Sequence, residues 1–448
     1  MFIMRETIVV PRKRIVLTTF GSFGDVHPFM AIALELQSRG HSPVIAASGL
    51  YRAKIEAAGL EFSSLRPDLA PPQDQDQELM DKVMEPKSGA RFLLSELILP
   101  HVRDSYADLI QIVKGADLLV THPLTLAGPL IARKIGVRWA SVILSPASFL
   151  SAYHPPVPPF WPWLRHLSLL GPSAINLVIR TIKKMTRPAV GPVDQLRRDL
   201  GLPDGGHPLF EGQHSPDLVL ALFSHLFSTP QPDWPPQTKV TGFAFYDGRH
   251  EAPMPSELSA FIAEGPKPIV FTLGSSAVWV ARDFFHQSIA AIRQVNQRAV
   301  LLIGDERNLP NEPLPPNVIT ANYAPYESML ERASVMVHHG GVGTTSQGLR
   351  AGVPTLIVPF AFDQADNAAH AARLGTSRTL HRSRYKADRV SRELEVLLKD
   401  YRYQQKATIV GEHLRREQGA LEACNLIEDF LGINKLRESE ELLYASSN

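Results

Sequence analysis

Short apolar runs recur along the chain, separated by stretches in which apolar residues return every three or four positions. Runs of the first kind are typical of buried strands in a parallel sheet, and the intervening stretches are typical of helices. In the first half the predicted strands are Arg14–Phe20, Pro43–Ala47, Leu118–Thr121, Trp139–Leu144 and Leu218–Phe223. In the second half they are Pro268–Thr272, Val300–Ile303, Val318–Thr320, Val335–Val337 and Thr355–Val358. The alternation of strand and helix predicts an α/β fold.

Each half opens in the same way, with a strand, a Gly-Ser loop and a helix. The first loop is Gly21 to Gly24, and the second contains Gly274, Ser275 and Ser276. Two such starts in one chain predict two Rossmann-like domains that face each other across a cleft.

A proline-rich stretch separates the halves. Residues 228–236, STPQPDWPP, cannot continue a helix. We therefore predict an N-terminal domain at 1–235, a linker zone at 236–255, a C-terminal domain at 256–432 and a polar tail at 433–448.

The first loop carries an acidic residue, Asp25, which we predict to be the N-cap of a helix from about Val26 to Arg39, with Pro28 in its first turn. This loop follows the carboxyl end of the first strand, where open α/β sheets bind ligands.

The most informative stretch runs from Val335 to Asn367. After the strand it reads HHGGVGTTSQG, a Gly-rich turn that leads into a helix, and such a turn offers backbone N–H groups to an anion. His339 and Thr344 add side-chain donors, and an acidic and amide pair, Asp363 and Gln364, follows the next strand. An ordinary well-capped turn is the alternative, but the combination favours a nucleotide-sugar phosphate site.

The composition of the chain restricts which classes of function and which cellular compartment are plausible. The 448 residues suit two domains, and 20% charged residues with a net charge of +1 give no case for nucleic-acid binding. The single cysteine, Cys424, excludes an internal disulfide and indicates a reducing compartment. No apolar run reaches the ~20 residues that span a bilayer, and the N-terminus does not resemble a signal peptide. The 16 histidines form no zinc motif, so we expect no metal site. The single cysteine, the lack of a membrane-spanning run and the character of the N-terminus lead us to expect a cytoplasmic protein.

A further segment indicates an apolar ligand. Residues 151–170 are aromatic and proline-rich, and Phe160, Trp161 and Trp163 are predicted to line an acceptor wall for a hydrophobic alcohol. A basic helix follows, in which three- and four-residue spacings gather four cations on one side: Arg180, Lys183, Lys184 and Arg187. This patch predicts a peripheral contact with the inner face of the membrane.

These motifs resemble the GT-B glycosyltransferases of family 1, which include the UDP-glycosyltransferases. The block HHGGVGTTSQGLRAGVPTLIVPFAFDQADNA is similar to the family's donor signature, and GSFGDVHPFMAIALELQSRGH is similar to its acceptor-side opening in sterol and antibiotic enzymes. LSPASFLSAYHPPVPP and PQPDWPPQTKVTGFAFYDG are similar to the bacterial rhamnosyltransferases that build rhamnolipids.

The resemblance implies a donor site for a UDP- or dTDP-sugar as co-substrate. In family terms, His339 and the turn contact the diphosphate, and Asp363 and Gln364 hold sugar hydroxyls. Gln347 stands where plant enzymes carry a ribose-binding Glu, so the resemblance leaves the nucleobase and sugar open. The implied donor residues are Ser275, Ser276, Tyr323, Ala324, His339, Gly340, Gly341, Gly343, Thr344, Gln347, Asp363 and Gln364.

The resemblance also implies an inverting, metal-independent transfer of a hexose or deoxyhexose to a lipid, sterol or polyketide hydroxyl, with no cofactor. Asp25 would be the base that takes the acceptor's proton. His27 lies too close to Pro28 to match the catalytic His of plant enzymes, and we assign it to the acceptor side. Two alternatives stay open: an NAD(P)-dependent oxidoreductase that uses Gly341 and Gly343, and a non-catalytic partner subunit of the same fold.

Overall fold

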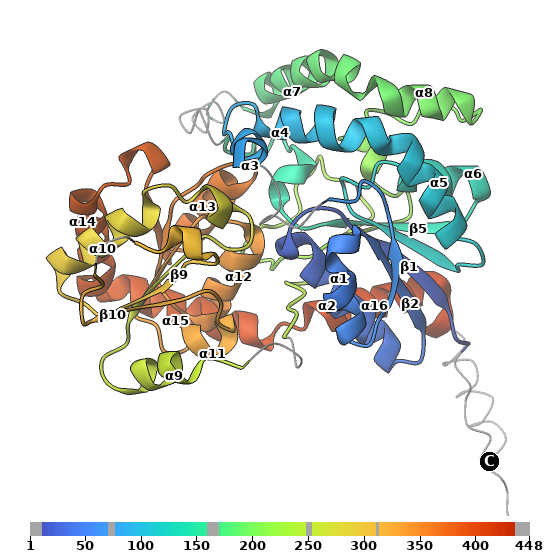
Figure 1. Cartoon of the computed structure of the whole chain (residues 1–448). Coiled ribbons are helices and arrows are strands. Elements are labelled where there is room, and N and C mark those ends of the chain that lie inside the picture. Colours follow the sequence, from blue (N-terminus) through green and yellow to red (C-terminus); the bar gives the residue numbers. More distant parts are fainter. Residues whose placement is uncertain are drawn as a thin grey trace, which may run out of the picture.

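The computed structural model describes residues 11–69, 77–158, 169, 171–247, 253–310 and 313–434. They form two Rossmann-like domains that lie side by side, each built on a fully parallel sheet (Figure 1). This confirms the predicted fold class, because the recurring apolar runs become strands that are buried on both faces.

The first sheet has seven strands in the order β3-β2-β1-β4-β5-β6-β7. Its strands are β1 (Arg14–Thr18), β2 (Ser42–Ala47), β3 (Glu61–Ser64), β4 (Leu118–Thr121), β5 (Arg138–Ile143), β6 (Leu218–Ala221) and β7 (Thr238–Val240). The helices that follow within this half are α1 (Phe23–Ser38), α2 (Arg52–Ala57), α3 (Gln77–Val83), α4 (Gly89–Phe92), α5 (Val102–Ile112), α6 (Gly128–Ile135), α7 (Pro172–Thr186) and α8 (Gly191–Asp199).

The second sheet has six strands in the order β10-β9-β8-β11-β12-β13. Its strands are β8 (Ile269–Thr272), β9 (Ala299–Leu302), β10 (Val318–Ala321), β11 (Val335–His338), β12 (Thr355–Ile357) and β13 (Ser377–Thr379). The helices from here to the C-terminus are α9 (Ser256–Ala263), α10 (Phe284–Val295), α11 (Tyr326–Leu330), α12 (Val342–Ala351), α13 (Gln364–Arg373), α14 (Ala387–Lys399), α15 (Tyr401–Arg416) and α16 (Gly419–Leu431).

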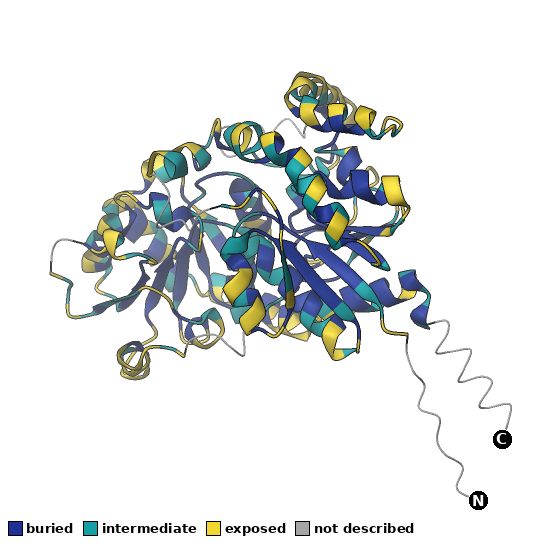
Figure 2. Cartoon of the chain, turned by 45° about the vertical axis from the view of Figure 1, so that its right-hand side comes forward, coloured by how far each residue is buried: buried dark blue, intermediate teal, exposed yellow. Residues whose placement is uncertain are grey.

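Each domain has apolar cores on its sheet, and the buried residues follow the strands while exposed residues line the outer helices (Figure 2). In the first domain, α1 and α16 share one core with the sheet, while α5 and α6 contribute to a second. In the second domain, residues of α10 and α14 pack in one core, and residues of α9 and α11 pack in another.

Two domain boundaries differ from the prediction. Strand β7 pairs with β6 in the first sheet, although the sequence placed its residues in the linker zone 236–255. Helix α16 was assigned to the C-terminal domain, yet it packs against α1 of the first domain (Figure 1). Glu428 of α16 bonds to Arg39 at 2.6 Å and to His41 at 3.1 Å, which anchors the helix there.

The start of α1 also differs from the prediction. Ser22, not Asp25, is the N-cap, and its hydroxyl accepts a hydrogen bond from the Gly24 N–H. Asp25 is the third helical residue, and its side chain returns to the Ser22 N–H in a capping box. These contacts give hydrogen-bond partners to the N–H groups of Ser22 and Gly24 at the start of the helix.

The remaining strand predictions are confirmed to within two residues at each end, whereas β3 and β13 were not predicted. Both lie at the edges of their sheets, and their short sequences lack a long apolar run. Helix α12 begins four residues earlier than predicted, at Val342. Among the described residues, no helix combines the length and the apolar character needed to cross a bilayer.

Candidate active site

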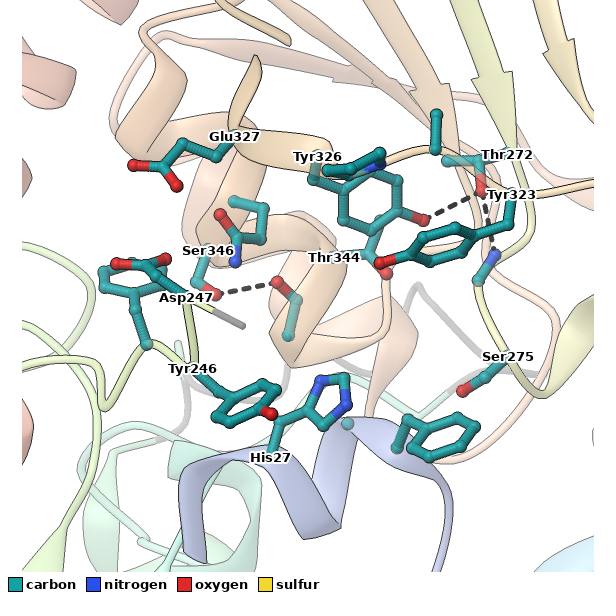
Figure 3. A pocket seen from close by; sticks show the side chains of 18 of the residues that line it. His27, Tyr246, Asp247, Thr272, Ser275, Tyr323, Tyr326, Glu327, Thr344 and Ser346 are labelled. Carbon is teal, nitrogen blue, oxygen red and sulfur yellow. Dashed lines mark hydrogen bonds between the residues drawn. The ribbon is translucent and has the colours of Figure 1, made fainter. Parts of the chain in front are cut away.

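A cavity of about 990 Å³ opens between the two domains. The first domain contributes the start of α1, with Phe23 and His27, and the second contributes β8, the segment before α11 and the start of α12. The connecting segment, residues 243–247, forms part of the wall and places Tyr246 beside His27 (Figure 3). The cavity therefore has walls from both domains, as the predicted cleft requires.

The N-termini of two helices converge in this cleft. A Cβ built on Gly343 of α12 would lie 3.5 Å from the Gly24 Cα of α1. Gly341 is the N-cap of α12, and no side chain caps the helix there. The first-turn N–H groups of α12 therefore keep their capacity to bind an anion, and the dipoles of both helices favour one.

His339 lies at the base of this turn. A Cβ at Gly274 would lie 2.5 Å from the His339 Cε1, and a Cβ at Gly341 would lie 2.5 Å from its Nε2. The two glycines thus make room for the ring. Burial lowers the pKa of His339 to about 4, so the imidazole is neutral at pH 7 and has one N–H to donate. Its Nδ1 is buried without a hydrogen-bond partner, which suits a group that awaits a ligand.

A hydroxyl network supports the same wall. The Tyr326 hydroxyl lies 2.9 Å from the Thr272 Oγ1, and that oxygen accepts the Gly274 N–H at 3.1 Å (Figure 3). Thr344 also bonds to the Tyr326 side chain. The network links β8, α11 and α12, and so holds the Gly274–Ser275 loop against the start of α12. Sequence reasoning did not single out Tyr326 or Thr272.

Other predicted donor residues also reach the cavity, namely Ser275, Tyr323, Ala324, Gly343, Thr344 and Gln347. Tyr323 is 47% exposed, so its ring presents a face for stacking at the cavity edge. Ser276, His339, Gly340, Gly341, Asp363 and Gln364 are not among the cavity-lining residues and lie in or behind the wall.

Asp363 and Gln364 lie deeper in the protein than expected, behind the cavity wall. The Gln364 Oε1 accepts the backbone N–H groups of Phe360 at 2.7 Å and Ala361 at 3.0 Å, which commits that oxygen to the preceding loop. Burial raises the pKa of Asp363 to about 6, and the nearby charge of Asp25 adds to the rise, while a hydrogen bond from Asn367 opposes it. Asp25 and Asp363 belong to different domains, so this electrostatic effect acts between the two domains.

Both carboxylate oxygens of Asp25 lie close to other polar groups. Its Oδ2 accepts the Ser22 N–H at 2.7 Å and the Ser22 hydroxyl at 3.1 Å. Its Oδ1 lies 3.4 Å from the Nε2 of His122, a buried residue that the sequence analysis did not identify. No local signal marks His122, because it follows an ordinary apolar strand.

Of the four predicted acceptor residues, His27 is the one that lies within the described residues. His27 lines the cavity between Phe23 and Tyr246, with ring centroids 5.2 and 5.0 Å away. Burial lowers its pKa to about 3, and the charge of Lys54 acts in the same direction, so the ring is neutral. Phe160, Trp161 and Trp163 lie outside the described residues.

Within the described residues, no three His, Cys, Asp or Glu side chains come together in a way that could hold a metal ion. The polar groups that line the cavity include amide N–H groups, hydroxyls and the neutral imidazole of His27, together with three charged side chains, Lys54, Asp247 and Glu327. These groups suit a phosphate and a sugar.

Known proteins share this sequence and arrangement. Residues 15–107 match the glycosyltransferase family 28 N-terminal domain, and residues 286–423 match the erythromycin biosynthesis protein CIII-like C-terminal domain. An O-mycaminosyltylonolide 6-deoxyallosyltransferase of Streptomyces fradiae is 32% identical over 432 residues, which cover 93% of this chain and 97% of that enzyme. The chain belongs to the GT-B glycosyltransferases. Because the match to a glycosyltransferase covers 93% of this chain, it rules out the alternative of an NAD(P)-dependent oxidoreductase.

Other relatives of this glycosyltransferase are longer. A sterol 3-beta-glucosyltransferase of Leptosphaeria maculans is 27% identical over 429 residues, which cover 92% of this chain but 28% of that protein. Among solved structures, the glycotransferase of kitacinnamycin superposes with a TM-score of 0.67 at 22% identity, covering 94% of this chain and 99% of that one. The spinosyn rhamnosyltransferase SpnG has a TM-score of 0.67 at 16% identity, covering 93% and 100%. These structures show that the fold is GT-B.

Proposed function

We propose that this glycosyltransferase moves a hexose or deoxyhexose from a nucleotide diphosphate sugar to a hydroxyl of a hydrophobic acceptor, with inversion and without a metal or other cofactor. The observation that carries the proposal is the meeting of the two helix N-termini, which brings Asp25 of one domain to the Gly-rich turn of the other. Asp25 itself is not a cavity-lining residue, but its neighbour Gly24 lines the cavity and lies against Gly343, so the base and the anion site are close together where the domains meet.

The chemistry follows from this arrangement. The Asp25 carboxylate takes the proton of the acceptor hydroxyl as the hydroxyl oxygen bonds to the anomeric carbon. The bond from that carbon to the diphosphate breaks, and the electron pair leaves with the phosphate. The N–H groups at the start of α12 and the neutral His339 stabilise the charge that develops there, in the manner of an oxyanion hole. These donors supply what a divalent cation supplies in other enzymes.

The relatives indicate the substrates. The Streptomyces fradiae enzyme is named for transfer of a 6-deoxyallosyl group to a macrolide, and the fungal enzymes are named for transfer of glucose to sterols. A structural neighbour, VinC, is described in complex with dTDP. We therefore propose a UDP- or dTDP-sugar as donor and a lipid, sterol or polyketide alcohol as acceptor.

Thermal-shift titration with UDP, dTDP and GDP tests the donor site, because a ligand that binds only the folded state raises its stability. We expect UDP or dTDP to raise the melting temperature and GDP to raise it less. The successful nucleotide sugar is then tested with sterols, hydroxy fatty acids and macrolide aglycones, and NMR of the product's anomeric proton reports inversion.

Asp25→Asn is the matched variant for the catalytic step. It keeps the size of the side chain, so nucleotide binding should persist while transfer is lost by on the order of 10²-fold or more. Unchanged transfer by this variant would remove Asp25 as the base. Absence of any nucleotide-dependent stabilisation would overturn the proposal as a whole.

Helix α7 supports a peripheral membrane contact. Its outer side exposes apolar side chains, of which Leu177 is 68% and Met185 is 75% exposed, and Arg180 and Lys184 are exposed beside them. An apolar stripe with a basic edge suits an anionic bilayer surface, at ~1 kcal/mol per cation near the surface. We propose that α7 rests on such a surface, near which an apolar acceptor would be concentrated.

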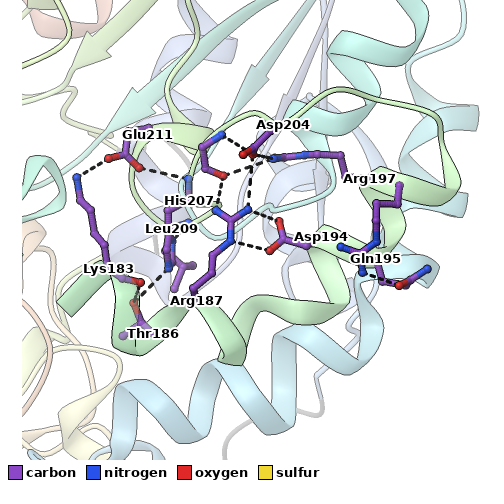
Figure 4. A network of polar contacts seen from close by, with 12 residues as sticks. Lys183, Thr186, Arg187, Asp194, Gln195, Arg197, Asp204, His207, Leu209 and Glu211 are labelled. Atoms are coloured by element: carbon purple, nitrogen blue, oxygen red, sulfur yellow. Dashed lines mark hydrogen bonds and ion pairs between the residues drawn. The ribbon is translucent and has the colours of Figure 1, made fainter. Parts of the chain in front are cut away.

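The basic patch is smaller than the sequence predicted. Lys183 pairs with Glu211, and Arg187 pairs with Asp194 at 2.8 Å (Figure 4). The first ion pair fastens α7 to the segment at Glu211, and the second joins the residue that follows α7 to α8. Two of the four predicted cations therefore have a structural role.

Flotation with phosphatidylglycerol and phosphatidylcholine vesicles tests this contact. We expect binding to phosphatidylglycerol alone, and its loss in an Arg180→Glu/Lys184→Glu variant. The control is Lys399→Glu/Arg402→Glu, which makes the same charge change on exposed side chains of the other domain. Equal flotation of both variants with the parent protein would remove the membrane proposal.

A further inference from the structure

We propose that Lys54, on α2 of the first domain, binds the diphosphate of the donor from the side of the cleft opposite the Gly-rich turn. This inference rests on the proposed function, because it needs a nucleotide diphosphate sugar as donor. It adds a cation from the first domain to a donor site that is otherwise built from the second. Lys54 is outside the predicted donor and acceptor sets.

The fold brings Lys54 to the cavity. Strand β2 neighbours β1 in the sheet, and a single helical turn, residues 49–51, leads from β2 into α2. The Tyr51 hydroxyl donates to the backbone carbonyl of Gly21 at 2.5 Å, which ties the start of α2 to the loop before α1. Lys54 follows one turn later and lines the cavity.

Two aromatic rings hold the Lys54 ammonium. Its Nζ lies 4.9 Å from the ring centroid of Phe23 and 5.7 Å from that of Tyr246, and both rings line the cavity. Contacts of this kind attract a cation to a ring face and restrict where it lies. His27 lies between the same two rings (Figure 3), and the charge of Lys54 helps burial to lower its pKa. The ammonium therefore acts on the cavity wall formed by α1 and the connecting segment.

This wall adjoins the Gly-rich turn of the second domain. Val342, the first residue of α12, packs against the same apolar cluster as Phe23 and Tyr246. The rings that hold Lys54 are thus neighbours of the helix N-terminus that offers its N–H groups to a phosphate. A phosphate bound there would have the ammonium on its other side.

The charges around the cavity favour an anion at this position. Among the cavity-lining residues that the structure describes, Lys54 is the one with a positive charge. Of the two acidic lining residues, Asp247 is paired with Arg350 of α12 at 2.6 and 2.8 Å, and Glu327 lies 3.9 Å from the same guanidinium. A nucleoside diphosphate brings several negative charges, whereas a helix N-terminus and a neutral imidazole offer only partial positive charges. A full cation meets this need, and it also stabilises the charge that develops as the sugar leaves.

The test compares ligands with and without phosphates by calorimetry. We expect Lys54→Gln to raise the Kd for UDP or dTDP by about tenfold or more, because hydrogen bonds to charged groups are strong. The Kd for uridine or thymidine should stay within about twofold of the parent enzyme. Lys54→Arg keeps the positive charge and should retain most of the affinity for the diphosphate. The difference between Lys54→Gln and the parent enzyme should shrink as salt is added.

Arg52→Gln is the matched control. Arg52 lies on the same helix, over the ring of Phe62 at 4.6 Å, and its Nη1 is 3.2 Å from Glu56, but it does not line the cavity. The variant removes the same charge from α2 and should bind UDP or dTDP with the Kd of the parent enzyme.

The outcomes separate this inference from the proposed function. If the parent enzyme binds UDP or dTDP and Lys54→Gln binds it equally well, Lys54 does not hold the diphosphate. The same conclusion follows if Lys54→Gln weakens the nucleoside as much as the diphosphate, or if Arg52→Gln has an equal effect. If the parent enzyme binds neither nucleotide, the proposed function fails instead. Weaker diphosphate binding by Lys54→Gln, with the melting temperature of the unliganded protein unchanged, supports the inference.

Discussion

Replacing Asp363 with asparagine should stabilise the folded enzyme at neutral pH, although this residue belongs to the predicted donor site. Burial raises the pKa of the Asp363 carboxyl from its usual 3.8 to about 6, and Asp25 adds to the rise. Between these values the unfolded chain has released its proton while the folded chain retains it. Folding stability therefore falls as pH rises through this window and stays lower above it.

The magnitude follows from the same values. The rise of the Asp363 pKa from 3.8 to about 6 corresponds to about 3 kcal/mol at pH 7. Asparagine has the same shape and an amide oxygen that can still accept from the Asn367 side chain, which donates to Asp363 at 3.0 Å. The variant removes the cost of the buried charge and keeps that hydrogen bond.

Urea denaturation between pH 4.5 and 7.5 measures the effect. We expect the unfolding free energy of Asp363→Asn, relative to the parent enzyme, to increase by about 2 kcal/mol across this range, with an unchanged denaturant slope. Asp25→Asn removes the neighbouring charge, so the pH-dependent step assigned to Asp363 should become smaller in that background. Parallel stability curves for Asp363→Asn and the parent enzyme would refute the reasoning.

Three further outcomes follow from the site. Gly21→Ala places a Cβ 2.3 Å from the Asp25 Oδ2 at a φ of +134°, and we expect kcat to fall by on the order of 10²-fold while donor binding persists, as steady-state kinetics would show. Gly274→Ala places a Cβ 2.5 Å from the His339 Cε1 and should weaken nucleotide binding about tenfold or more by calorimetry, with the melting temperature as the check on folding. Burial lowers the pKa of His339 from 6.5 to about 4 in the folded enzyme. As the pH drops below 6.5, this imidazole takes up a proton in the unfolded chain before it does so in the folded enzyme, and the free energy of unfolding therefore falls. In acid denaturation, His339→Gln should reduce this loss of stability by up to about 3 kcal/mol.

Much of the architecture was readable in the sequence. Most strands of both sheets were predicted because a strand buried on both faces needs a continuous apolar run, and such runs are local. Strands β3, β7 and β13 are only partly buried and were missed. The Gly-rich turn before α12 was also predicted, since the backbone conformation of Gly340, with a φ of +92°, favours glycine. The donor side was therefore identified from one continuous stretch of chain.

The sequence could not decide contacts between distant segments. Ser22, rather than Asp25, caps α1, because the capping box depends on how the chain leaves β1. Helix α16 carries an apolar face that suits either domain, and the ion pair of Glu428 with Arg39 and its hydrogen bond with His41 hold it on the first. The spacing of apolar residues indicates that one face of a helix is buried, but it does not indicate which domain covers that face.

The same division applies to the site. The sequence by itself determined which residues could bind an anion and which carboxylate could accept a proton, because these properties belong to residue types and short motifs. Only the tertiary structure decided that His122 contacts Asp25, and that Asp25 lies near enough to Asp363 to raise its pKa. The order of strands sets the first contact, and the packing of two domains sets the second. Neither has a local signature, since both join residues that are far apart along the chain.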